Sequence, residues 1–391
     1  MNYILFDGSV RNALLPFTFT RPVADIRIGI LTIREKWEKY LGNTTTTLTE
    51  EYLSDKFPMV EMEENVMIYA SYCPNEILAE MVKSLEPKQA IAKNGEIIAF
   101  YTQDTQEEVD FDAYEIIEFD DDCIVVSNPW DIFAKNDAAL REDFELLTED
   151  RKSQPIPSSC NVIGAENIFI EDGAKLEFVT LNASTGPIYI GKNSEIMENS
   201  VIRGPFALCE GGQVKLATKV YGATTVGPHS RIGGEVSNSV LFGYSNKGHD
   251  GFLGNSVLGE WCNLGADTNN SNLKNNYEEV KLWSYEKNGF AKTGLQFCGL
   301  MMGDHSKCGI NTMFNTGTVV GVSANIFGSG FPRNFVPSFS WGGASGFTTY
   351  LTNKAFETAR IVMSRRNLVF DEQEARILEH IFEETKQYRK E

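Results

Sequence analysis

One histidine of the sequence stands in a setting that suits acid–base chemistry. His249 lies in the segment 247–251, which reads KGHDG and interrupts a regular apolar pattern. A histidine can accept a proton from a nucleophile near neutral pH, because its unperturbed pKa lies there. Asn263 and Asn272 follow, and their amides could bind a substrate. A lone loop histidine is more often a surface or packing residue, and asparagine is common in tight turns, so residue type alone leaves these roles open.

A zinc site is the other chemistry that histidines suggest. His229, His249 and His305 all lie in the same region of the chain. No two of them are within about five residues of each other, as a close pair of zinc ligands would be. We therefore expect no metal site at these histidines.

The element that must position His249 is indicated by a six-residue repeat. Neither a helix, with a period of 3.6, nor a strand, with a period of 2, explains an apolar residue at every sixth position. Glycine directly follows several of these residues, as in Ile190-Gly191 and Val226-Gly227. The uninterrupted run consists of Ile190, Ile196, Ile202, Leu208, Val214, Val220, Val226 and Ile232.

A parallel β-helix explains this repeat. Each hexad would be a short strand and a turn, with the apolar side chain pointing inward and glycine in the turn. Three hexads close one triangular coil, and stacked coils share one core. The pattern breaks at 237–250 and 269–293, and insertions in repeat folds commonly lie at the binding face. It resumes with Phe252, Leu258 and Leu264, and again with Met302, Cys308, Phe314, Val320 and Ile326.

The order of residues around His249 carries a resemblance to a known family. An aromatic residue, Phe252, follows His249 by three positions, residues 263–268 read NLGADT, and Asn272 completes the set. This order resembles the acetyltransferase domain of the bifunctional N-acetylglucosamine-1-phosphate uridyltransferase/glucosamine-1-phosphate acetyltransferase family. The resemblance implies that residues 156–335 form a left-handed parallel β-helix.

The resemblance also implies roles for single residues. His249 would deprotonate the amino group of a hexosamine 1-phosphate, which then attacks the thioester of acetyl-CoA directly. Asn263 and Asn272 would hydrogen-bond the sugar and the acyl group. Ala266 would lie with its backbone against acetyl-CoA, and Lys247 would contact the substrate. The identity of the sugar and the choice between nitrogen and oxygen as the acceptor stay open.

Two departures from the family concern the sugar phosphate. The family has tyrosine where Phe252 stands, and Ser237 lies near the place where a lysine is expected. The cations that would hold the phosphate cannot be aligned without gaps. The candidates are Lys215, Lys219, Arg231 and Lys247.

Residues 1–150 are predicted to form a Rossmann-like α/β domain. Short apolar runs at 3–6 and 65–70 predict buried strands, and residues 28–40 predict an amphipathic helix. Strands alternating with helices are typical of a layered α/β fold.

The start of this domain is similar to the signature of sugar-phosphate nucleotidyltransferases. Residues 6–11 read FDGSVR, and LPFT and Arg21-Pro22 follow. The resemblance implies that the loop of Gly8 cradles the phosphates of UTP or dTTP, that Arg11 neutralises the departing pyrophosphate, and that Mg²⁺ bridges the oxygens.

The signature is eroded, however. Val10 stands where a second glycine belongs, and Val23 stands where a lysine belongs. The run Asp120–Asp122 could bind a metal, but such runs are usually solvated. A working nucleotidyltransferase and a derived domain with weak or absent activity therefore both remain open.

The end of the chain, 345–391, is predicted to be helical. Residues 371–374 resemble a capping box, and an apolar stripe follows on one helix face. The stripe needs a partner, which could be the β-helix of the same chain or of a neighbour. The resemblance implies a homotrimer. The stripe consists of Ile377, Leu378, Ile381 and Phe382.

Composition narrows the classes of function. Lys and Arg number 35 against 54 Asp and Glu, which gives a net charge of −19. Such a chain is not expected to bind nucleic acid, which requires clustered cations. No apolar run approaches the roughly 20 residues of a membrane helix, and the seven cysteines are scattered, so we expect a cytoplasmic protein.

The main hypothesis is acetyl transfer from acetyl-CoA to the amine of a sugar phosphate, with glucosamine 1-phosphate as the expected acceptor. Sugar-1-phosphate nucleotidyl transfer would be a second activity. The alternative is a non-catalytic trimeric protein with degenerate active sites, which binds sugar nucleotides or has a regulatory role.

Overall fold

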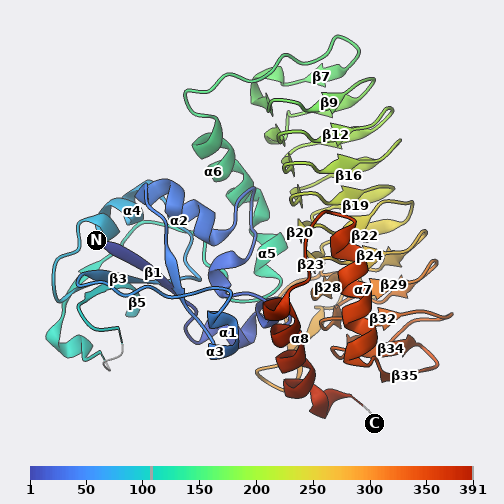
Figure 1. Ribbon diagram of the computed structural model, residues 1–391. Helices are drawn as coiled ribbons and strands as arrows, with labels where there is room; N and C mark the ends of the chain where they lie inside the picture. Colours follow the sequence, from blue (N-terminus) through green and yellow to red (C-terminus); the bar gives the residue numbers. More distant parts are fainter. Residues whose placement is uncertain (106–108, 390–391) are drawn as a thin grey trace.

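The computed structural model describes residues 1–105 and 109–389, which form three parts (Figure 1). An N-terminal α/β part lies beside a tall column of stacked β-coils, and two C-terminal helices lie against the lower half of the column. No helix in the described part of the chain is long and apolar enough to span a membrane.

The N-terminal part is built on a six-stranded mixed sheet. Its strand order is β2-β1-β3-β5-β4-β6. The β1–β2, β1–β3 and β4–β6 pairs are parallel, whereas β5 runs antiparallel to both of its neighbours. The strands are β1 (Asn2–Phe6), β2 (Thr46–Leu48), β3 (Asn65–Tyr69), β4 (Gln89–Lys93), β5 (Glu96–Thr102) and β6 (Glu115–Glu118). The helices are α1 (Val10–Ala13), α2 (Ile33–Leu41), α3 (Glu51–Ser54), α4 (Glu76–Lys83), α5 (Asp131–Ala134) and α6 (Asn136–Thr148).

The two predicted N-terminal strands are present as β1 and β3, but the predicted helix at 28–40 begins later, at Ile33. Thr32 caps it: its hydroxyl accepts from the Glu35 N–H at 3.1 Å, and the Glu35 carboxylate accepts from the Thr32 N–H at 2.6 Å. This reciprocal pair satisfies N–H groups that a helix leaves free, so the helix starts there. The preceding residues form a turn with Gly29 in the left-handed region (φ +75°).

The β-helix has three faces built from parallel strands of successive coils, and one antiparallel strand closes the third face. The first face contains β7 (Asn161–Ile163), β10 (Thr180–Asn182), β13 (Val201–Arg203), β16 (Lys219–Tyr221), β19 (Glu235–Ser237) and β22 (Phe252–Gly254). The second contains β8 (Ile168–Ile170), β11 (Ile188–Ile190), β14 (Phe206–Leu208), β17 (Thr224–Val226), β20 (Val240–Gly243), β23 (Val257–Glu260), β28 (Leu300–Met302), β31 (Thr318–Val320) and β33 (Phe335–Val336). The third contains β9 (Lys175–Leu176), β12 (Glu195–Ile196), β15 (Gln213–Val214), β18 (Arg231–Ile232), β21 (Asn246–Lys247), β24 (Asn263–Leu264), β29 (Lys307–Cys308), β32 (Asn325–Ile326), β34 (Ser340–Gly343) and β35 (Gly346–Thr349).

The six-residue pattern is the inner wall of this column. All eight residues of the uninterrupted run are at most 2% exposed. Ile190 pairs with Leu208, and Leu208 pairs with Val226, so three hexads make one coil. The predicted left-handed parallel β-helix is confirmed.

The coil changes length just before His249, and this changes which side chains at positions 247 and 252 point into the core. Ile232 pairs with Lys247, so a lysine occupies an inward position. Leu253, not Phe252, then faces the core: Leu253 pairs with Val236 and is fully buried. Phe252 was predicted to point inward, and this was wrong, because a shift of one residue along a strand moves a side chain to the opposite face.

The second break in the repeat holds two further short pairs. β25 (Asn269–Asn270) pairs with β30 (Met313–Phe314) in parallel. The insertion between them contains an antiparallel hairpin of β26 (Lys281–Ser284) and β27 (Gly289–Lys292). Leu282 of this hairpin is buried in the core that joins the β-helix to the N-terminal part.

The C-terminal helices are α7 (Thr352–Ser364) and α8 (Glu372–Glu384). The carboxylate of Asp371 accepts from the Glu374 N–H at 2.9 Å and caps α8, which is the N-cap half of the predicted capping box. The apolar stripe of α8 packs within the same chain, against α3 and the lower coils. His380 of α8 stacks on Tyr52 of α3 with ring centroids 3.9 Å apart.

One apolar core joins the N-terminal part to the second face of the β-helix. Alternation along β20 points Leu241 into the coil and Phe242 outward. Phe242 meets Phe17 with ring centroids 5.2 Å apart. The N-terminal part is therefore fixed to the column by continuous packing.

Candidate functional site

The N-terminal loop that resembles a phosphate cradle is filled by an aromatic ring. Gly8 has φ +58°, and a methyl group added there would overlap the ring of Tyr69. The Tyr69 hydroxyl accepts from the Val10 N–H at 3.1 Å and lies 3.4 Å from the Ser9 hydroxyl. The ring therefore lies over the loop, and its hydroxyl takes up an amide that a phosphate would need.

Arg11 is directed into the protein. Its guanidinium donates to the Thr18 carbonyl at 2.9 Å and to the Tyr52 hydroxyl at 2.5 Å, and the side chain is buried. Because Tyr52 stacks on His380, Arg11 helps to anchor α8 to the N-terminal part. In this arrangement the guanidinium does not face a nucleotide.

The described residues do not form a ready-made Mg²⁺ site. Across residues 1–105 and 109–389 no three His, Cys, Asp or Glu side chains gather as metal ligands. The Asp7 carboxylate accepts from the Val23 N–H at 2.7 Å and from the Thr49 hydroxyl at 2.5 Å. Burial raises the pKa of Asp7. Asp120–Asp122 are exposed on the surface.

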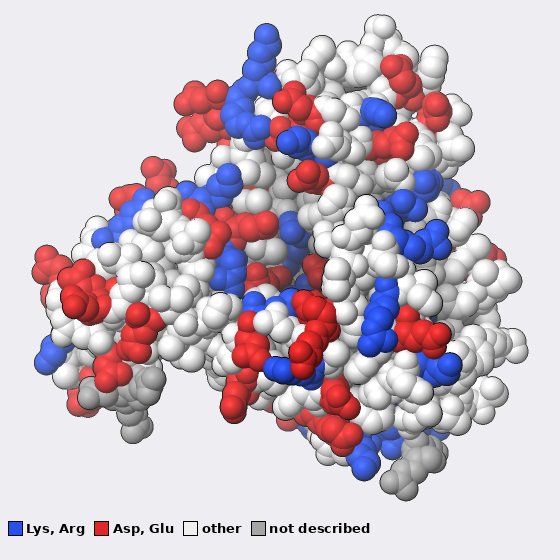
Figure 2. All heavy atoms as spheres, in the orientation of Figure 1, with Lys and Arg blue, Asp and Glu red and all other residues white. Residues whose placement is uncertain are grey.

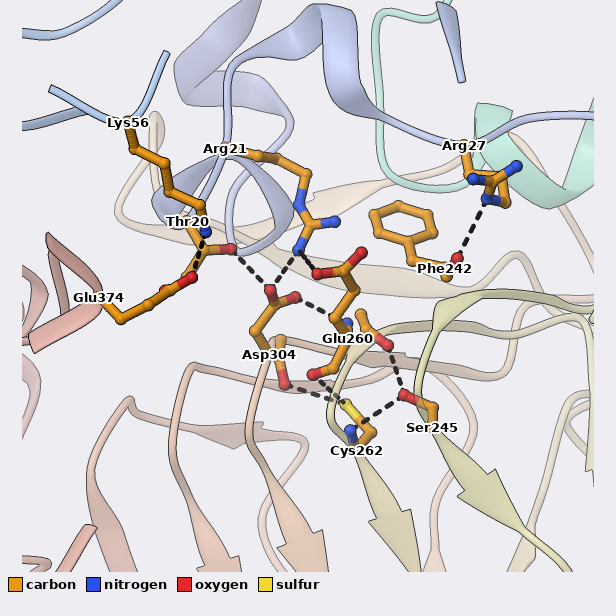
Figure 3. A network of polar contacts seen from close by, with 12 residues as sticks. Thr20, Arg21, Arg27, Lys56, Phe242, Ser245, Glu260, Cys262, Asp304 and Glu374 are labelled. Atoms are coloured by element: carbon orange, nitrogen blue, oxygen red, sulfur yellow. Dashed lines mark hydrogen bonds and ion pairs between the residues drawn. The ribbon is translucent and has the colours of Figure 1, made fainter. Parts of the chain in front are cut away.

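Arg21, from the eroded signature, forms the centre of a polar network between the two main parts (Figure 3). It forms an ion pair with Asp304 and lies 3.6 Å from the carboxylate of Glu260. The Thr20 hydroxyl also donates to Asp304 at 2.9 Å. Arg21, which stands in the segment that resembles the signature, thus serves here as an interdomain contact.

His249 lies on the turn that leads from the third face to the first. It is exposed, and its imidazole forms no hydrogen bond within the described part of the chain. The turn is held from inside: the buried Lys247 ammonium donates to the His249 carbonyl at 2.5 Å. Burial lowers the pKa of Lys247 to about 8. Lys247 therefore supports the turn and does not reach into solvent toward a substrate.

Asn263 lies near this turn. It stands on β24 beside Asn246 of β21, whose side-chain amide donates to the side-chain Oδ1 of Asn263 at 2.9 Å. His249 follows Asn246 by three residues on the same coil. The structure thus brings Asn263 and the His249 turn to one side of the column.

Asn272 lies elsewhere. Its amide donates at 2.8 Å to Asn255, which directly follows β22. Since β22 lies between His249 and Asn255 on the coil, His249 and Asn272 flank opposite ends of the first face. The carbonyl of Ala266 accepts from the Asn311 N–H at 2.8 Å, which links successive coils.

The candidate phosphate-holding cations separate into different environments. Lys219 is exposed and pairs with Glu235 at 3.3 Å, whereas Lys215 donates to Gln213 at 3.1 Å. Arg231 alone among the sequence candidates shares a cavity with Asn263. Sequence reasoning missed three other cations of that cavity, Lys307, Arg365 and Arg366. The last two follow α7, and no local motif marks them.

Fold and site together define a protein with an α/β domain of the sugar nucleotidyl transferase type and a hexapeptide-repeat β-helix. Residues 3–152 match the model of the family described as sugar nucleotidyl transferase. The chain is similar to the bifunctional sugar-1-phosphate nucleotidylyltransferase/acetyltransferase of Sulfurisphaera tokodaii, with 29% identity over 216 residues, 54% of this chain and 47% of that relative. The resemblance predicted from the motifs is confirmed, at modest identity.

Two other relatives match shorter segments. The bifunctional protein GlmU of Methanocaldococcus jannaschii is 29% identical over 136 residues, 35% of this chain and 28% of the relative. The uncharacterized acetyltransferase YaiX of Escherichia coli is 25% identical over 144 residues, 36% of this chain and 62% of the relative. The chain thus matches less than two thirds of the length of each of these relatives.

Proposed function

We propose that the protein transfers an acetyl group from acetyl-CoA to the amino group of a sugar phosphate, with glucosamine 1-phosphate as the expected acceptor. The observation that carries the proposal is the exposed, unbonded imidazole of His249 on a turn supported by the buried Lys247. The names of two relatives, which include acetyltransferase, agree with this class of reaction.

The chemistry needs one base and two bound substrates. His249 takes a proton from the amino group as the nitrogen attacks the thioester carbonyl. The C–N bond forms, the C–S bond breaks, and the proton passes from the imidazolium to the departing thiolate. Asn263 would orient the acceptor by hydrogen bonds. No covalent enzyme intermediate is required, because a thioester is already activated.

A homotrimer would complete this site. In one chain, β22 lies between the His249 turn and Asn255, the partner of Asn272. Symmetric copies could bring the two ends together across an interface. The first face has apolar side chains suited to such a contact: Ile163 is 56% exposed, Val201 47% and Tyr221 41%.

Nucleotidyl transfer from UTP or dTTP is the second candidate, favoured by the family match of residues 3–152. The geometry of the loop argues against it, because Tyr69 covers the loop and Arg11 is bonded inward. We therefore propose that the N-terminal domain mainly supports the β-helix.

Release of free thiol from acetyl-CoA in the presence of glucosamine 1-phosphate tests the main proposal. His249→Gln should lower the rate about 100-fold or more, since general base catalysis contributes that much. His380→Gln, the same change at a half-exposed histidine of α8, is the control and should retain the rate. Full activity of His249→Gln would overturn the assignment. A wild-type protein that binds sugar phosphates but releases no thiol would favour the non-catalytic alternative.

A further inference from the structure

A cavity of about 490 Å³ lies between the third face of the β-helix and the end of α7. Its volume is in the range of small-molecule sites. Four cations line it from two parts of the chain: Arg231 and Lys307 from the column, and Arg365 and Arg366 from the segment that follows α7. Lys and Arg side chains gather near the upper end of α7 in the space-filling view (Figure 2). The other lining residues are Tyr244, Asn246, Trp261, Cys262, Asn263, Thr358 and Val362.

These four cations have no counter-charge among the residues that the structure describes. No carboxylate belongs to the described lining, and none of the four forms an ion pair with a described residue. Other cations do pair with carboxylates, as Arg151 does with Glu171 at 2.7 Å. The chain carries 54 acidic residues against 35 basic ones, so a cavity wall with four cations and no described carboxylate contrasts with the overall charge.

One hydrogen-bond donor of the cavity also lacks a partner among the described residues. The Arg231 Nε atom is buried without a hydrogen-bond partner among the described residues. Buried donors of this kind are normally satisfied, and an unsatisfied one points to a missing partner. An anion in the cavity would accept from Arg231, Arg365 and Arg366, whereas the Lys307 ammonium already donates to the His305 carbonyl at 2.8 Å.

Mutual repulsion marks the cluster as well. Burial and the neighbouring Arg231 lower the pKa of Arg366. Burial lowers the pKa of Lys307 to about 8. The Arg366 shift includes repulsion from Arg231, whereas the Lys307 shift comes from burial, and a bound anion would oppose both.

The polar wall favours a ligand that also carries hydroxyl groups. The Asn246 amide donates to Asn263, which leaves the Asn263 amide hydrogens and the Asn246 carbonyl oxygen without a partner among the described residues. This amide pair offers donors and an acceptor next to the cations. Sugar hydroxyls suit such a pair, because each can donate and accept.

We propose that this cavity binds a phosphate ester, with the phosphate held by Arg231, Arg365 and Arg366. Lys307 completes the positive wall, and the Asn246–Asn263 pair binds hydroxyl groups of the ligand. The choice of a sugar phosphate as the ligand rests on the proposed function, whereas phosphate binding itself does not. The C-terminal segment thereby becomes part of the binding site and not only a cover for the column.

Calorimetric titration of the full-length protein tests the site without turnover. The probes are inorganic phosphate, glucosamine 1-phosphate, CoA and UTP, each at two salt concentrations. We expect glucosamine 1-phosphate to bind, more weakly at high salt. Arg231→Gln and Arg366→Gln should each weaken binding about tenfold, since each removes a charge-assisted contact.

Arg376→Gln is the matched control, because this exposed arginine lies on α8 outside the cavity. Arg365 is exposed, so Arg365→Gln should fold like the wild type. Weaker binding by this variant would show that the losses in the other variants are not folding defects. Tighter binding of CoA or UTP that the same variants abolish would support the phosphate site and assign it to a nucleotide. Absence of binding by every probe, or equal binding by Arg231→Gln, Arg366→Gln and the control, would overturn the proposal.

The two proposals fail in different ways. Phosphate binding without thiol release would refute acetyl transfer and leave this site intact. Thiol release that is lost in His249→Gln but unchanged in Arg231→Gln and Arg366→Gln, with unchanged affinity, would refute this site alone.

Discussion

Arg21 of the N-terminal domain and Asp304 of the β-helix form a buried ion pair, and both side chains are less than one tenth exposed. Thr20 and the Glu260 N–H also donate to Asp304, the latter at 2.9 Å. The carboxylate is therefore satisfied from both parts of the chain. This network joins the N-terminal segment around Thr20 and Arg21 to the lower coils of the β-helix.

Breaking this pair should destabilise the whole molecule. Asp304→Asn leaves the buried Arg21 with Glu260, 3.6 Å away and about one third exposed, as its remaining counter-charge, at a cost of about 3 kcal/mol. Arg21→Met combined with Asp304→Leu should recover part of that loss, because no charge is then stranded. Chemical unfolding measures both, and Arg376→Met at the surface is the control. An Asp304→Asn protein as stable as wild type would show that the pair does not hold the parts together.

The N-terminal loop should not support nucleotidyl transfer. Wild-type protein mixed with Mg²⁺, UTP or dTTP and a sugar 1-phosphate is expected to release no pyrophosphate above background, because Tyr69 occupies the loop. Arg11→Met should lower thermal stability through loss of the Thr18 and Tyr52 contacts, with thiol release retained. Pyrophosphate release that Arg11→Met abolishes would contradict this prediction.

Lys247 should make stability depend on pH in a defined window. Its pKa is about 8 in the folded protein and about 10.4 in an unfolded chain, so between these values only the unfolded chain holds the proton. The free energy of unfolding of wild type, relative to Lys247→Met, should therefore rise from about pH 8 to pH 10. Urea unfolding at pH 7, 8.5 and 10 measures it. The exposed Lys219→Met should show no such change, and a flat Lys247 difference would be evidence against burial of the ammonium.

Gly251 should be needed for the His249 turn. It has φ +117°, and an added methyl would overlap the carbonyl of Thr268. Gly251→Ala should therefore lower the melting temperature and reduce thiol release by displacing His249. Gly294→Ala is the matched control: φ is also positive, +77°, but nothing lies within 4 Å. Its cost should be confined to backbone strain and leave thiol release unchanged.

The β-helix was predictable from the sequence because its packing repeats. Each inward residue, such as Leu208, meets the equivalent residue of the next coil, so a local six-residue pattern contains nearly all the packing information. The motif around His249 was visible for a similar reason, since its residues keep fixed intervals on consecutive coils. The N-cap of α8 at Asp371 likewise depends only on neighbours in the chain.

What the tertiary structure decided depends on contacts between distant segments. The ring of Tyr69 reaches the loop of Gly8 only because β3 lies beside β1. Arg366 meets Arg231 across a cavity only because α7 packs on the third face. Lys247 became an inward residue through a change in coil length that shifts the register by less than one repeat. Local patterns determine which elements form, whereas side-chain partners across elements depend on how the whole chain packs.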